Sequence, residues 1–357
     1  MKKGIKPRKV IYLFGAGATQ AELNYQSCRV NLLMRDNTDN GLEGVCSRIM
    51  KSVRKDTQLQ WLYEATKSTS QIDIEQLISL LEELNLEKYR RAADKLRNLY
   101  YQDILRNLNE TRIIDEPKLS MALLELHENE TLKEKEVLKG IICLNHDYLL
   151  ETACNQIHKG INLGVPFTSK AYKYNENAPM ILKLYGSFNW RSGEQIRIIE
   201  ANPLKPHREI LWIPPTIAKE TKSYPFTKLL GMAYELLLLE CDLLRIIGCS
   251  LSQNDWKVIS ILFKTQCIRL KKCFDIELIL GQETGENIKQ RLGYLRNVKT
   301  IAELEGSFTD YFDQEPDNPY ENWLRKTIDE KKINENTLGN NLKELYYKGT
   351  RANVLNL

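Results

Sequence analysis

Residues 9–19 read KVIYLFGAGAT, and this stretch decides the fold class. Its apolar run from Val10 to Phe14 is rich in β-branched and aromatic side chains, which is typical of a buried parallel strand. Gly15 and Gly17 follow at once, and glycine lets the backbone turn tightly and approach a bound group closely. If a helix begins near Thr19, its free N–H groups face the turn and favour a phosphate.

Two interpretations of this Gly-x-Gly turn are open from the residues alone. A strand, a glycine turn and a helix is how α/β folds hold nucleotides. However, the third glycine of a G-x-G-x-x-G sequence is absent, because position 20 is Gln20. The stretch therefore indicates either a nucleotide-binding loop or an ordinary tight turn between a strand and a helix.

Composition excludes several classes of protein. The chain has 357 residues, 42% hydrophobic and 27% charged, which fits a soluble globular protein of roughly two domains. Its 51 basic and 47 acidic residues leave a net charge of +4, too small to predict nucleic-acid binding. No apolar run reaches the roughly 18 residues that span a membrane, and the N-terminus lacks the apolar core of a signal peptide. We therefore expect a cytoplasmic protein.

The eight cysteines predict neither a zinc site nor a disulfide framework. None forms a CxxC pair, so the usual zinc spacing is absent and we expect no metal. Cys143 and Cys249 lie inside apolar runs, where a buried free thiol is the expected state.

The remaining chain alternates between strand and helix patterns. Apolar or alternating runs predict strands at 140–145, 180–184, 195–199, 209–213, 243–249, 274–280 and 298–301. Helical spacing is found at 148–157, 225–239, 255–270 and 287–295. This alternation predicts a Rossmann-like α/β fold with a mostly parallel sheet covered by helices on both faces.

Three units are expected along the sequence. Residues 8–40 and 139–302 form the Rossmann-like domain. Residues 41–138, poor in Pro and Gly and rich in leucine at helical spacing, predict an insertion of about four helices after the first strand–helix unit. Residues 303–357 predict a polar helical tail with Trp323, Leu324 and Ile328 as its strong anchors.

Ligands of parallel α/β sheets bind beyond the carboxyl ends of the strands. That rule selects four loops, each directly after an apolar run: 15–19, 145–147, 185–190 and 248–255. Taken together and in order, these loops resemble the motifs of the sirtuin-type (SIR2-like) domains of bacterial antiphage defence proteins. The matching segments are FGAGAT at 14–19, LNHDYLLE at 144–151, KLYGSFNW at 183–190 and GCSLSQND at 248–255. The resemblance spans about residues 8–300, with the helical insertion as the variable part.

The resemblance implies that the chain binds NAD+ and breaks the bond between nicotinamide and ribose. Asn145 would orient water or the ribose near the anomeric carbon, and Asp147 would face the positive charge that develops at the nicotinamide end. Asp147 could also cap the following helix, and both roles can hold together. The pyrophosphate would lie on the first turn, formed by Gly15, Ala16, Gly17, Ala18 and Thr19. Further NAD+ contacts would come from Gly186, Ser187, Gly248, Ser250 and Asp255.

Ser250 and Asp255 would line the adenosine side, although a turn or a helix cap explains the same two residues. Tyr185 departs from the family, which has a catalytic histidine at this position. A histidine titrates near neutral pH and acts as a base on a ribose hydroxyl, whereas a tyrosine titrates near 10 and can only hydrogen-bond there. Natural divergence and a substitution introduced to inactivate the enzyme both explain Tyr185.

The chain has four histidines that bear on the base missing at position 185. His146 lies inside the second motif and could substitute, although an aromatic ring packed beside the helix is the favoured interpretation. His127, His158 and His207 are expected on the surface.

Two classes of function follow. Without the four-cysteine zinc module of the deacetylases, the resemblance favours an NAD+ hydrolase that blocks phage growth by depleting NAD+. No sensor domain is apparent after residue 300, so we expect control through a homo-oligomer or a partner such as a HerA-type ATPase, with the insertion and tail as contact surfaces. The alternative is a module that binds NAD+ or ADP-ribose without turnover.

Overall fold

The computed structural model describes residues 6–37, 41–69, 72–217, 219, 222–301, 303, 318–331, 333–334 and 337–354. Its centre is a six-stranded sheet with the strand order β4-β2-β1-β7-β8-β9, in which every neighbouring pair is parallel. The strands are β1 (Arg8–Phe14), β2 (Glu136–Cys143), β4 (Ile181–Lys183), β7 (Leu243–Ile247), β8 (Asp275–Ile279) and β9 (Val298–Thr300). The order runs outward from β1 in both directions, so the fold is Rossmann-like and its switch point lies between β1 and β7.

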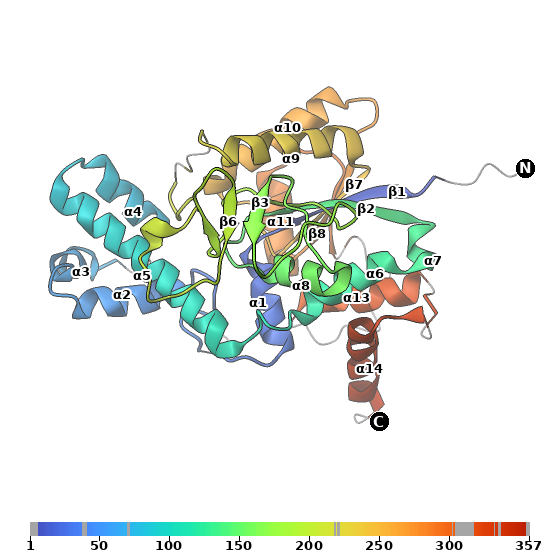
Figure 1. The fold of residues 1–357 in the computed structure, drawn as a ribbon, viewed down its shortest axis with the longest axis horizontal. Coiled ribbons are helices and arrows are strands. Elements are labelled where there is room, and N and C mark those ends of the chain that lie inside the picture. Colours follow the sequence, from blue (N-terminus) through green and yellow to red (C-terminus); the bar gives the residue numbers. More distant parts are fainter. Residues whose placement is uncertain are drawn as a thin grey trace, which may run out of the picture.

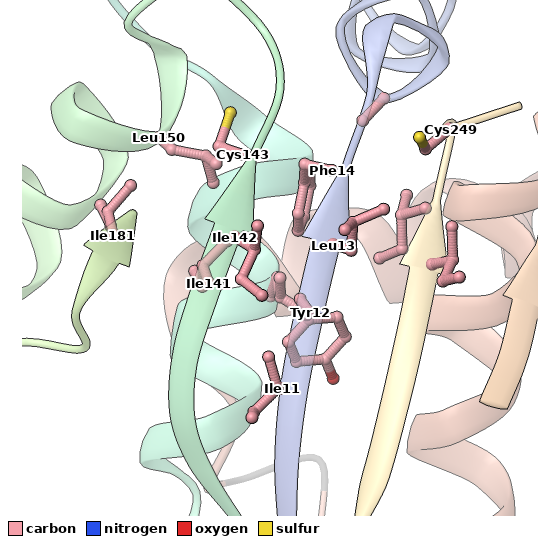
Figure 2. Close-up of a cluster of buried hydrophobic side chains, with 14 of the residues drawn as sticks. Ile11, Tyr12, Leu13, Phe14, Ile141, Ile142, Cys143, Leu150, Ile181 and Cys249 are labelled. Carbon is pink, nitrogen blue, oxygen red and sulfur yellow. The ribbon is translucent and has the colours of Figure 1, made fainter. Parts of the chain in front are cut away.

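Helices cover both faces of this sheet (Figure 1). One face carries α9 (Phe226–Glu240), with α10 (Trp256–Ile268) packed beside it. The other carries α1 (Ala16–Tyr25), α6 (Lys118–Glu128) and α13 (Pro319–Glu330). A strand covered on both sides must be apolar on both sides, which is why Val10 to Phe14 do not alternate. All five are buried, and Figure 2 shows the side chains of Ile11 to Phe14 on β1, between β2 and β7.

The smaller elements complete these layers. α8 (Leu149–His158) packs on α6, and α11 (Gln282–Arg291) lies beside β9. A second, three-stranded sheet has the order β3 (Phe167–Ser169), β6 (Ile196–Ile198) and β5 (Trp190–Arg191). All eight cysteines are free thiols, and both Cys143 and Cys249 are buried as expected.

Two sequence-based element predictions differ from the structure. The expected strand at 209–213 is wrong: η1 (His207–Glu209) and an irregular segment occupy this region, with a single bridge between Gly186 and Trp212. The apolar alternation there places Ile210 and Trp212 in the core of the helical insertion. The helix expected at 287–295 is shifted, because α11 begins at Gln282 with a polar first turn that gave no apolar signal.

The insertion has a hydrophobic core of its own. It contains α2 (Val45–Lys55), α3 (Gln60–Thr66), α4 (Ile74–Glu83) and α5 (Glu87–Thr111), which extend away from the sheet in Figure 1. α6 and α7 (Glu130–Lys133) also fall within 41–138, but their apolar side chains belong to the core of the sheet. The four helices with a common core therefore end at Thr111, and the domain boundaries themselves stay a prediction.

The C-terminal segment is more firmly packed than the sequence suggested. Trp323, Leu324 and Ile328 are buried as expected, and so are Tyr320 of α13 and Leu342 of α14 (Asn340–Val354). α14 lies against α6. Residues 304–317, the first part of the expected tail, lie outside the described residues.

Two histidines expected on the surface are buried instead. His127 is 5% exposed, and its Nε2 lies 2.8 Å from the Tyr12 hydroxyl. Burial and the charge of Arg245 lower the pKa of His127 to about 3. His207 is also buried, with Nε2 2.9 Å from Asp94 Oδ1. Segments distant in the sequence bury both side chains, so local sequence does not reveal their burial. His158, in contrast, is partly exposed.

Arg245 forms a buried charge network in the centre of the sheet. Its guanidinium donates to Glu136 at 2.6 and 3.0 Å and to Glu277 at 2.8 Å. It also lies 5.1 Å from the ring centroid of Trp323, so the network connects the sheet to α13. Burial raises the pKa of Glu136, but the hydrogen bonds and charge of Arg245 outweigh it and lower that pKa to about 2.

Arg245→Met is expected to lower the free energy of unfolding by about 3–5 kcal/mol, because it removes the buried cation that bonds both Glu136 and Glu277 and leaves Glu136 with only the partly exposed Lys331 at 3.2 Å. Adding Glu136→Gln should recover part of this loss, since the double variant removes one uncompensated charge. Urea unfolding at pH 7 measures the free energy of unfolding of Arg245→Met, of Glu136→Gln and of the double variant. A double variant that loses the full sum of the two single losses contradicts this coupling.

Candidate functional site

The glycine turn is the beginning of a helix and not a separate loop. α1 begins at Ala16, three residues earlier than expected, so the Gly-Ala-Gly-Ala sequence forms its first turn. The N–H of Gly17 donates to Gly248 O at 2.7 Å. A Cβ at Gly17 would lie 2.8 Å from Gly248 Cα, which is too close for any side chain. Glycine is therefore needed here because the loops after β1 and β7 pack backbone to backbone at the switch point.

Asn145 lies directly against this turn. It follows β2, and its Nδ2 donates at 2.9 Å to both Gly15 O and Thr19 Oγ1. Because both bonds come from Nδ2, the plane of the amide is fixed and Oδ1 faces away from the two acceptors. The side chain is half-buried. Residues 130 positions apart in the chain thus meet at the ends of neighbouring strands.

Asp147 joins the same cluster and also bonds the backbone at the start of α8. Its Oδ2 accepts a hydrogen bond of 2.6 Å from Thr19 Oγ1. Its Oδ1 accepts from the backbone N–H of Leu149 at 3.2 Å, at the start of α8. The N-cap residue of α8 is Tyr148, so Asp147 bonds the first N–H of the helix from one position before the cap, and the same carboxylate lies beside the glycine turn.

A second cluster lies around Asp255, at the end of η2 (Gln253–Asp255) after β7. The Tyr185 hydroxyl donates to Asp255 Oδ1 at 3.0 Å, and Lys219 Nζ donates to the same oxygen at 2.8 Å. Lys219 Nζ also lies 4.4 Å from the ring centroid of Tyr185 and 3.9 Å from Glu75 Oε1. Ser252 Oγ donates to Asp255 Oδ2 at 3.0 Å, so hydrogen bonds occupy both carboxylate oxygens.

These contacts change what Tyr185 can do. Burial first, and then the charge of Asp255, raise the pKa of the Tyr185 hydroxyl. It is therefore a proton donor at neutral pH and not a base. Since Tyr185 follows β4 and Asp255 follows β7, their hydrogen bond joins loops that follow two strands separated in the sheet by β2 and β1. Tyr185 is 2% exposed, and Asp147 and Asp255 are each 8% exposed, so side chains close this edge of the sheet.

His146 is a packed aromatic side chain. Its ring lies 5.0 Å from Trp212 and 5.4 Å from Phe188, and Nε2 donates to Ile213 O at 2.9 Å. Burial, followed by the charges of Lys219 and Lys183, lowers its pKa to about 3. A group with this pKa is a poor base at neutral pH, so the packing interpretation is favoured over the catalytic one.

Three residues that were predicted to contact NAD+ belong to neither of the two clusters. Ser187 is fully buried and donates to Glu151 Oε1 at 3.3 Å, beside the buried Lys183. Gly186 has a φ of +77° and lies so close to Leu211 that a Cβ would meet its carbonyl oxygen at 2.3 Å. Both residues hold the loop in shape. Ser250 is exposed, with its carbonyl bonded to Arg291.

Two residues of the second cluster, Glu75 and Lys219, were not predicted. Glu75 is in the first turn of α4 in the helical insertion, where an acidic residue is an ordinary helix start. Asn254 donates to it, and desolvation by burial raises its pKa. Lys219 follows a Pro-Pro loop, and no local pattern distinguishes it from a surface lysine.

Over the part of the chain that the structure describes, no group of three or more His, Cys, Asp or Glu side chains could hold a metal ion. Within the same ranges, every helix is too short or too polar to cross a membrane. Comparison with known protein families and with curated proteins finds no match to this sequence.

Proposed function

We propose that the chain is a sirtuin-type NAD+ hydrolase, which converts NAD+ and water to nicotinamide and ADP-ribose. One observation carries the proposal: the amide of Asn145 is held at 2.9 Å against the glycine turn, at the switch point of a Rossmann-like sheet. This is the edge where such sheets bind dinucleotides. The order of the four strand-end segments, which resembles that of sirtuin-type domains, adds the identity of the substrate.

In this proposal each cluster has a task. The N-terminal end of α1, where Ala16 is exposed, binds the pyrophosphate through its helix dipole. The bond between the ribose C1′ and the nicotinamide nitrogen breaks, and its electron pair neutralises the pyridinium ring. Oδ1 of Asn145 accepts a hydrogen bond from the water that adds to C1′, and the water's second proton passes to solvent. The carboxylate of Asp147 stabilises the positive charge that develops on the ribose.

The closed edge requires a rearrangement before NAD+ can bind. The Tyr185–Asp255 hydrogen bond joins the loops after β4 and β7, so in this proposal these two side chains separate when NAD+ enters between the loops. Asp255 is also joined to the helical insertion through Lys219 and Glu75. An activating signal at the insertion, from self-assembly or from a partner such as a HerA-type ATPase, would act through this connection. We propose that such an enzyme acts in the cytoplasm as an effector of antiphage defence.

Tyr185→His is expected to raise nicotinamide release at least about tenfold, because it restores a side chain that can act as a base near neutral pH. The chain and the variant are incubated with NAD+, alone and with the protein encoded beside it, and nicotinamide is quantified. Tyr224→His, at a half-exposed tyrosine, is the matched control and should leave the rate unchanged. No nicotinamide from either the chain or Tyr185→His, with the partner present, rejects the proposal.

A second function is favoured by the state of Tyr185. Because its hydroxyl donates to Asp255 and its pKa is raised, the site lacks a base at this position. The chain would then bind NAD+ or ADP-ribose without turnover, as a sensor or structural subunit. Calorimetry that detects stable binding, with NAD+ recovered intact from both the chain and Tyr185→His, supports this alternative over the hydrolase.

A further inference from the structure

A hollow of about 430 Å³ lies on the helical insertion, away from the strand ends. The turn between α4 and α5, the first half of α5 and η1 form its walls. Its size is within the range of about 300–1,000 Å³ found for small-molecule sites. The residues that line it are all polar or charged and include four arginines: Arg90, Arg91, Arg97 and Arg208.

The charges in this lining do not balance. The four guanidinium groups face three carboxylates, so the hollow carries one excess positive charge. The carboxylate pairs are Arg91–Glu87, Arg97–Glu82 and Arg208–Asp94. Arg90 donates to Asn85 Oδ1, which is a neutral amide oxygen. Its positive charge is therefore the one that the lining leaves uncompensated.

The hydrogen-bond donors in the wall also exceed the acceptors. Arg97 Nε is buried, and within the described residues it has no hydrogen-bond partner. The Arg97 side chain is only 16% exposed. Asp94 already accepts one hydrogen bond at each oxygen, from His207 at Oδ1 and from Arg208 at Oδ2, and none comes from Arg97 Nε. A buried donor without an acceptor is costly, so this wall favours a ligand that supplies acceptor oxygens.

We propose that this hollow binds a phosphate-bearing anion, with Arg90 and Arg97 as its principal donors and Arg208 as an exposed third contact. Guanidinium groups offer planar, paired donors that match the oxygens of a phosphate, and the charge assists each hydrogen bond. An inorganic oligophosphate and the phosphate chain of a nucleotide share this chemistry. The site is separate from the strand-end clusters, and the proposal does not depend on NAD+ hydrolysis.

Isothermal titration of the full chain with inorganic tripolyphosphate, and separately with ATP, tests the proposal at near-physiological salt. We expect binding by both probes, weakened at least about tenfold in the double variant Arg90→Ala/Arg208→Ala. Both residues are exposed, so their loss should leave the fold intact, which a thermal melt of the unliganded variant checks. The matched control is Arg106→Ala, an exposed arginine on the same helix but outside the hollow, which should bind as the parent does.

The two probes also separate the sources of the phosphate. Equal affinities indicate that the phosphates alone are recognised, and tighter ATP binding that is lost in the double variant indicates a nucleotide; both support the site. The proposal is overturned if neither probe binds the parent chain. It is also overturned if the double variant binds as tightly as the parent, or if Arg106→Ala weakens binding as much as the double variant does.

Discussion

Replacing Asn145 by alanine is expected to lower nicotinamide release by about two to three orders of magnitude. The amide is the group that the structure fixes at the switch point, through two hydrogen bonds from Nδ2 to the glycine turn. Alanine removes both the oxygen that orients the water and the bonds that hold the turn. Because this contribution arises at the reacting carbon, kcat should fall far more than the KM for NAD+ rises. Steady-state rates are measured in whichever background releases nicotinamide, the chain with Tyr185 or the Tyr185→His variant.

The control for this variant is Asn177→Ala, at an exposed asparagine remote from the strand ends, which should retain the parent rate. A thermal melt establishes that both variants are folded. A folded Asn145→Ala variant with a rate within about threefold of its parent would show that the amide does not act on the scissile bond.

Gly248→Ala is expected to have the largest effect on stability, lowering the free energy of unfolding by about 4 kcal/mol or more. Gly248 has a φ of +59°, a conformation that alanine rarely adopts. Its Cβ would lie 1.9 Å from Ala18 N and 2.3 Å from Gly17 C, both of them backbone atoms. The loops after β1 and β7 would have to move apart, so the variant should also lose any binding of NAD+.

Gly231 provides a matched alanine substitution with the opposite expected sign. It lies on the exposed face of α9, and a Cβ added there meets no atom within 4 Å. Gly231→Ala should therefore stabilise the chain by about 0.5–1 kcal/mol, the gain expected for alanine over glycine in a helix. Urea unfolding compares the two variants. Losses of less than about 1 kcal/mol for Gly248→Ala would contradict the close packing of the two loops.

The sequence was sufficient for the fold class because parallel strands leave a strong local signal. Val10–Phe14 and Leu243–Ile247 are buried on both faces, so the first is a continuous apolar run and the second is apolar except for Arg245. The segment 209–213 carries a similar pattern for another reason. Its apolar residues pack into the helical insertion, and local periodicity cannot distinguish this from a half-buried strand.

The candidate site was predictable where it depends on strand ends and unpredictable where it depends on the insertion. Asn145 and Thr19 follow neighbouring strands, so the topology rule alone brings them together. Glu75 and Lys219 reach the same edge through tertiary contacts between distant segments. The bond from Tyr185 to Asp255 crosses 70 positions of sequence, and neither residue carries a local sign of it.

The contacts around Asp255 explain why buried side chains close the edge of the sheet at the strand ends. Lys219 places one ammonium group between the buried carboxylate of Asp255 and the partly buried carboxylate of Glu75, and breaking such a group of charges is costly. The helical insertion is thereby coupled to the end of β7. Any signal that moves α4 must also change the surroundings of Asp255, and with them the hydrogen bond of Tyr185.

A structure of the chain determined with NAD+ bound tests the central claim most directly. The account predicts the pyrophosphate on the first turn of α1, the ribose C1′ beside the Asn145 side chain, and the Tyr185–Asp255 hydrogen bond broken. NAD+ bound away from the ends of β1 and β7, with that hydrogen bond intact, would contradict it.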